Sequence, residues 1–221
     1  RYAVKSDMTI LDFIRNLRNG QQTPVKLKFN NIRTKEDFAE LISEQLMMVK
    51  SDLLSILNDE NKCEKLGFTV DNVVAMFIPN TYEFYWDIET ESFINRMQKE
   101  YTKFWTPERM EKAKEINLTP IEVSTVASIV EEECMYTDEY PKVAGLYLNR
   151  LKRGQLLQAD PTVKFAVGDF SLRRILFKHT EVNSPYNTYL HTGLAPGPIR
   201  IPSINGIDAV LNYSKHDYLY M

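Results

Sequence analysis

Apolar residues recur every three or four positions along much of the chain, which is the spacing of one helix face. Segments with this pattern are 8–20, 34–58, 91–105, 106–116, 119–133 and 140–154. The fifth segment has the clearest start signals: Thr119 precedes Pro120, and Glu122 completes a capping box with the threonine. The pattern therefore predicts a helix-rich protein in which 119–133 is the best-specified helix.

Strand-like alternation appears in three places. Residues 1–4 and 24–29 alternate on either side of the first helical segment, which predicts a small strand–helix–strand unit over 1–30. Residues 71–86 are rich in aromatic side chains and are interrupted at Pro79 and Asn80. We expect an α+β fold, with the small unit at 1–30 and a larger mixed, helix-rich domain over 31–221.

The composition of the sequence changes after residue 154. Residues 155–206 hold many prolines, glycines and asparagines, as in "LQADPTV" and "SPYNTYLHTGLAPGPIRIPS". We interpret this region as long and irregular. Binding residues are often found in such surface segments.

Composition and charge exclude several functions. Hydrophobic residues make up 43% of the chain, which suits a globular core, and the net charge is −3 without a basic stripe, so no nucleic-acid partner is expected. The two cysteines, Cys63 and Cys134, are too few for a disulfide framework. Because the three histidines lie far apart, no metal or other cofactor is expected.

Targeting signals are not visible in the sequence. No apolar run approaches the roughly 20 residues that span a bilayer, and no signal peptide is present. The chain begins at Arg1 and stops at Met221. We interpret it as a fragment, so any anchor could have been trimmed away.

Three consecutive glutamates end the best-specified helix. On a helical wheel Glu132 points away from the apolar stripe and should be solvated, while Glu131 lies on a small, polar flank beside Ala127. Glu133 lies on the bulky apolar flank, where a carboxyl resists ionisation and can serve as a general acid. On helix geometry alone, a solvated helix end explains the three glutamates as well.

The order of several motifs changes this balance. "FIPNTYEFYW", "ASIVEEE", "AGLYLNRLKRGQLLQADPTVKFAVG", "SPYNTYLHTGLAPGPIRIPS" and "DYLYM" follow one another along the chain. Together they closely resemble the bacterial endolytic murein transglycosylases, the YceG-like family. The resemblance runs from the N-terminal region to the last residue, and residues 1–20 also resemble a LysM-type glycan-binding unit.

The resemblance implies a specific reaction. Members of the family cleave the β-1,4 bond after N-acetylmuramic acid in peptidoglycan glycan strands without water, leaving 1,6-anhydro ends. The helix motif of the family is Ala-Ser-Ile-hydrophobic-Glu-any-Glu. Its second glutamate, which corresponds to Glu133 here, would be the catalytic acid. The family also implies an N-terminal membrane anchor, a catalytic domain on the extracytoplasmic side of the membrane, and cell-wall synthases as partners.

The irregular region supplies candidate sugar-binding groups. Sugars are held by polar side chains and by aromatic rings against their apolar faces. The candidates that we expect to bind substrate are Gln158, Asp160, Thr162, Tyr186, Asn187, Thr188 and Tyr189.

Two other functions remain open from the sequence. The chain could be a non-catalytic peptidoglycan-binding module in which the LysM-like unit is the active part. It could also be a muramidase-type hydrolase that uses Asp160 or Glu131 to activate water. Glu133 in an apolar setting argues against the binding module, and the lack of a clearly placed second carboxylate argues against the hydrolase.

Overall fold

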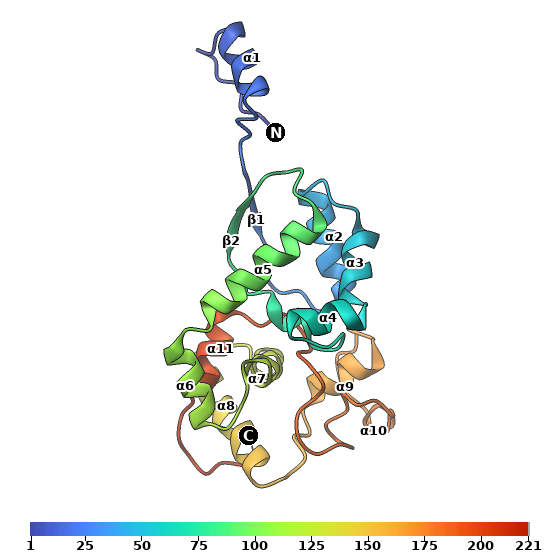
Figure 1. Ribbon diagram of the computed structural model, residues 1–221. Helices are drawn as coiled ribbons and strands as arrows, with labels where there is room; N and C mark the ends of the chain where they lie inside the picture. The colour runs from blue at the N-terminus through green and yellow to red at the C-terminus, as the bar shows by residue number, and fades with distance from the viewer. Residues whose placement is uncertain (221) are drawn as a thin grey trace.

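The computed structural model describes residues 1–220 and is rich in helices, with one two-stranded antiparallel sheet (Figure 1). The elements are α1 (Ile10–Arg18), β1 (Val25–Lys28), α2 (Lys35–Gln45), α3 (Lys50–Leu57), α4 (Glu60–Leu66), the 3-10 helix η1 (Val73–Met76), β2 (Thr81–Phe84), α5 (Thr90–Phe104), α6 (Pro107–Glu115), α7 (Pro120–Glu133), α8 (Tyr140–Lys152), α9 (Asp160–Val167), α10 (Phe177–Thr180) and α11 (Ile204–Leu211). The expected α+β class is confirmed. Among the described residues, no helix is both long and apolar enough to cross a membrane.

The first of two apolar cores lies between the sheet and helices α2–α5. Strand β1 runs antiparallel to β2, with Val25 opposite Phe84 and Leu27 opposite Tyr82. Leu27 and Phe38 are fully buried in this core. Strand β1 therefore belongs to the main body. The domain boundary that we expected at residue 30 would separate β1 from β2, its partner strand in this sheet.

Helix α7 forms the centre of the second core. Residues Val123 to Glu131 are all buried, because α6, α8, α9, α11 and η1 pack around the helix, which Figure 1 shows nearly end-on. The capping box of Thr119 and Glu122 is formed, and Pro120 occupies the first turn as predicted. The last turn of α7, which carries the three glutamates, is consequently held on a rigid element.

The region expected to be irregular contains three helices. Helix α9 begins with Asp160 and Pro161 and ends at Gly168, whose left-handed backbone (φ 75°) terminates it. Helix α11 begins after Ser203, whose hydroxyl accepts a hydrogen bond from Gly206 N. The expected long irregular region over 155–206 is present, but α9, α10 and the first residues of α11 interrupt it.

The N-terminal segment projects from the body (Figure 1). Helix α1 forms as predicted, but none of its residues is buried, and Ile10 remains 79% exposed. The strand expected at residues 1–4 is wrong, because these residues form no sheet pairing. Residues 1–30 therefore do not form the compact strand–helix–strand unit that the pattern suggested.

Candidate active site

Glu133 is the last residue of α7 and is half-buried. The hydroxyl of Tyr147, on α8, donates a hydrogen bond to Glu133 Oε2 across 3.2 Å. Burial raises the pKa of Glu133 above its ordinary value, and the negative charge of Asp160 acts in the same direction. The Tyr147 hydrogen bond and the positive charge of Arg150 oppose this shift in pKa without cancelling it. Glu133 is thus partly buried with a raised pKa, and its named neighbours are polar or charged groups rather than the apolar flank that the helical wheel suggested.

The other two glutamates are bound to cations. Glu131 is buried, accepts hydrogen bonds from Ser203 N and Oγ, and lies 3.3 Å from Arg200 Nε. Glu132 accepts from Arg33 Nη2 at 2.6 Å and from Arg200 Nη1 at 2.9 Å. The expectation that Glu132 is solvated is wrong, because Arg33 and Arg200 come from distant segments and cover that side of the helix.

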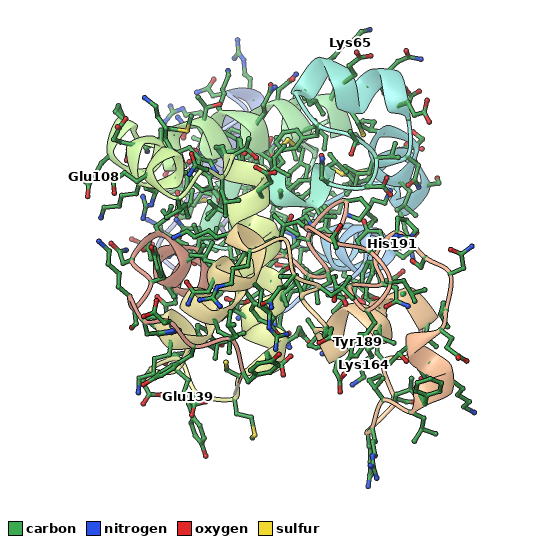
Figure 2. The ribbon with its side chains drawn as sticks, turned by 90° about the horizontal axis from the view of Figure 1, so that it is seen from below. Lys65, Glu108, Glu139, Lys164, Tyr189 and His191 are labelled. Atoms are coloured by element: carbon green, nitrogen blue, oxygen red, sulfur yellow. The ribbon has the colours of Figure 1, made fainter. Side chains whose placement is uncertain are left out.

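Glu133 lines two cavities. The first, of about 260 Å³, is lined by Glu133, Asp160, Lys164 and the loop 172–175. The second, of about 490 Å³, is lined by Glu133, Cys134 and residues of α8 and of the C-terminal segment. Figure 2 labels Lys164, which lines the first cavity, on one side of this face and Glu139, which lines the second, on the other. A long substrate that crosses Glu133 could therefore occupy both cavities.

The second cavity is mainly aromatic and aliphatic. Tyr136, His216, Tyr218 and Tyr220 line it, and the rings of His216 and Tyr218 stack with their centroids 4.5 Å apart. Cys134 also lines this cavity, so it is less enclosed than the buried thiol that we expected. Burial, Glu139 and Glu133 raise the pKa of Cys134 to about 11, so the thiol keeps its proton at neutral pH.

Comparison with known proteins is consistent with this geometry. The sequence profile of the YceG-like family matches residues 1–221. The chain belongs to the YceG-like family. The crystal structure of a YceG-like protein from Listeria monocytogenes superposes with a TM-score of 0.78 at 28% identity, covering 99% of this chain and 77% of that one.

Two curated relatives of this YceG-like chain are named endolytic murein transglycosylase. The Bacillus subtilis protein is 34% identical over 197 residues, which are 82% of this chain and 54% of the relative. The Streptococcus pneumoniae serotype 2 protein is 36% identical over 146 residues, which are 64% of this chain and 26% of the relative. The chain thus spans about half, or less, of the length of these relatives.

Asp160 lines the first cavity of this YceG-like site, and Tyr189 is hydrogen-bonded to it. Tyr189 donates a hydrogen bond to Asp160 Oδ1 at 2.6 Å, and Asp160 lines the first cavity beside Glu133. Gln158 has an exposed side chain and lines a smaller hollow of about 210 Å³ with Arg150 and Tyr220. Of the predicted substrate-binding residues, Gln158, Asp160 and Tyr189 therefore remain accessible to a glycan.

Three other predicted substrate-binding residues have no exposed polar surface. Thr162, Asn187 and Thr188 are at most 2% exposed. The hydroxyls of Thr162 and Thr188 lie 2.8 Å apart, and Asn187 donates to the carbonyls of Thr180 and Val182. We correct the expectation that they contact sugar: their hydrogen-bonding groups are used to hold the loop that carries Tyr189.

Tyr186 also makes mainly structural contacts. Its hydroxyl donates to the carbonyl of Asp71 at 3.1 Å, and its ring packs against Phe165 with the centroids 4.8 Å apart. It lines neither of the two cavities at Glu133. Its position favours a structural contact between the loop, α9 and the segment before η1.

Sequence reasoning missed residues that shape this site. Tyr147 and Arg200 contact the glutamates from α8 and from the loop before α11. Lys164, Arg173 and Arg174 line the first cavity. The spacing of Lys164 four residues after Asp160 could have placed both on one helix face, had α9 been recognised.

We expect Arg200 to be the principal cation that stabilises the end of α7. Arg200→Ala leaves Glu131 buried without its cation, so it should lower the free energy of unfolding by about 3 kcal/mol. The matched control is Arg33→Ala, which leaves Glu132 paired with Arg200 and should cost about 1 kcal/mol or less. Denaturant titration of both variants measures the difference, and equal losses would contradict the assignment.

Proposed function

We propose that this chain cleaves the β-1,4 bond between N-acetylmuramic acid and N-acetylglucosamine in peptidoglycan strands, as an endolytic murein transglycosylase. The observation that carries the proposal is the position of Glu133. Its carboxyl has a raised pKa and lines two cavities. A carboxyl with a raised pKa keeps its proton to higher pH than an ordinary glutamate, and from the wall of a cavity it can donate that proton to a glycosidic oxygen.

The proposed reaction needs one residue in two roles. Glu133 protonates the leaving oxygen while the muramic ring gains oxocarbenium-like character. The resulting carboxylate removes the proton from the C6 hydroxyl of the same sugar, whose oxygen then bonds to C1. Because this nucleophile is tethered to the substrate, its effective concentration is high and no water has to be positioned. The product carries a 1,6-anhydro ring.

The two cavities support cleavage within strands. Glu133 lines both of them, so a strand can extend from the reacting bond in either direction. The aromatic rings of Tyr136 and Tyr218 in the second cavity suit the apolar faces of sugars. An enzyme specific for strand ends would need one side of the acid to be closed.

A muramidase-type hydrolase is the second candidate, and the position of Asp160 keeps it open. Asp160 lines the same cavity as Glu133 and could orient a water molecule. Glu131 is unsuited to this role, because it is buried and bonded to Ser203 and Arg200. A module that only binds peptidoglycan would not need an acid with a raised pKa at the centre of its groove.

Glu133→Gln should reduce strand cleavage by at least about 1,000-fold, because the amide cannot donate an acidic proton. The fold should persist, since the substitution is nearly isosteric. Glu111→Gln on α6 is the control, as this exposed carboxylate lines neither cavity. Cleavage is followed by chromatography of the released fragments. Full activity of Glu133→Gln would remove Glu133 from the mechanism.

Oxygen-18 water separates the two enzyme classes. The transglycosylase should give 1,6-anhydro muramic ends, one water lighter than reducing ends and free of heavy oxygen. Mass spectrometry of fragments from purified strands reads both features. Reducing ends that carry oxygen-18 as the main product would show a hydrolase, with Asp160 as the next residue to test.

The pH profile should respond in opposite directions to two substitutions. The Tyr147 hydrogen bond lowers the pKa of Glu133 and the Asp160 charge raises it. Cleavage requires the protonated acid and is lost as pH rises through that pKa. Tyr147→Phe should therefore move the alkaline limb of kcat/KM to higher pH, and Asp160→Asn should move it to lower pH. Shifts of the same sign in both variants would contradict the assignment.

Residues 1–20, the part of the expected 1–30 unit that lies outside the main body, are proposed to bind glycan as a LysM-like unit. The support is that α1 projects from the body with its apolar residues exposed. Deleting residues 1–20, before strand β1, should weaken binding to long strands more than to short ones, through lost multivalency. An equal loss for both lengths in a folded variant would show that the segment does not extend the binding surface.

The cellular setting is part of the same proposal. We expect the protein to be anchored in the cytoplasmic membrane by a segment outside residues 1–221, to act on the extracytoplasmic side, and to work beside cell-wall synthases. Membrane fractionation of the full-length protein and cross-linking in cells test these points. Recovery in the soluble cytoplasmic fraction would contradict the location.

A further inference from the structure

The first cavity carries three cationic side chains. Lys164 comes from α9, and Arg173 and Arg174 come from the loop between α9 and α10. Both arginines are exposed and Lys164 is half-exposed. Among residues 1–220, none of the three forms an ion pair. Their charge is therefore available to a ligand.

The acidic side chains of the same cavity are already engaged. Glu132 is paired with Arg33 and Arg200, and Asp160 accepts a hydrogen bond from Tyr189. Glu133 is held toward its uncharged form by burial, which raises its pKa. The accessible charge of this cavity is consequently positive, whereas the second cavity presents mostly aromatic and aliphatic groups.

A neutral sugar backbone gives no reason for such a cluster. The N-acetylated sugars of a glycan strand are uncharged and are held by hydrogen bonds and ring stacking. Muramic acid differs, because its lactyl ether carries a stem peptide with free carboxylates. Guanidinium groups bind carboxylates through paired, charge-assisted hydrogen bonds.

We infer that Lys164, Arg173 and Arg174 form a subsite for the stem-peptide carboxylates of a muramic residue bound beside Glu133. This inference rests on the proposed function and adds a substrate preference to it. The strand would then bind in one orientation. A peptide-bearing muramic residue would occupy the cationic cavity, and sugar rings would occupy the aromatic one. Strands whose stems retain free carboxylates are the preferred ligands.

Binding measurements test the inference separately from cleavage. The parent protein is Glu133→Gln, and the ligands are end-labelled strands with intact stems, strands whose stem carboxylates are capped as amides, and strands stripped of their stems. By fluorescence anisotropy, intact strands should bind the parent about tenfold more tightly than capped ones, and added salt should reduce the difference. Stripped strands, which keep only the lactyl carboxylate, should bind like capped ones.

Substitution of the two arginines should remove this preference. With Arg173→Ala and Arg174→Ala added, intact and capped strands should bind equally, while Arg173→Lys and Arg174→Lys should retain part of the difference. The control pair is Arg153→Ala and Lys178→Ala, two exposed cations outside both cavities. Thermal unfolding verifies that each variant is folded.

Two outcomes would overturn the inference: equal binding of intact and capped strands by the parent, or a preference that survives both arginine-to-alanine changes. If stripped strands bind like intact ones, the cluster binds the lactyl carboxylate and the stem assignment is wrong. Wild-type protein that cleaves none of the strands would defeat the proposed function, while the binding data would still decide the subsite.

Discussion

Arg200 provides the ionic contact on which the rest of the site depends. Helix α7 ends in three consecutive carboxylates, at the end of a helix where the macrodipole disfavours negative charge. Arg200 contacts Glu131 and Glu132 together, and Ser203 at the start of α11 donates to Glu131. A Cβ on Gly206 would clash with the Glu131 carboxylate, so this close approach to α11 favours a glycine. The contact anchors the last turn of α7, which ends at Glu133.

The three glutamates in the last turn of α7 have different surroundings, and therefore different roles. Glu131 and Glu132 are paired with guanidinium groups, which hold both side chains against neighbouring segments. Glu133 is partly buried and lies near the negative charge of Asp160. Both effects raise its pKa and so favour its neutral form. A general acid needs a proton to donate, so only Glu133 suits that role. The two paired glutamates stabilise the scaffold that presents it.

Local signals in the sequence predicted the elements that are locally determined. Helix α7 and its capping box follow from residue types and spacing within one helix. The pairing of Glu132 could not be foreseen, because Arg33 and Arg200 lie 99 and 68 residues away along the chain. Thr162 and Thr188 appeared suited to sugar binding, but each is buried against the other across 26 residues. Residues 1–4 alternate like a strand yet pair with none, because alternation does not supply a partner.

The central claim is that Glu133 carries a proton under conditions in which an ordinary glutamate has lost it. A titration of carbon-13-labelled glutamate side chains by NMR tests it directly, with the Glu133→Gln spectrum assigning the resonance. The account predicts a pKa for Glu133 above the ordinary glutamate value of about 4.3. It also predicts a further rise in Tyr147→Phe, which loses the hydrogen bond that favours the carboxylate. A pKa for Glu133 at or below the ordinary value would contradict its assignment as the proton donor.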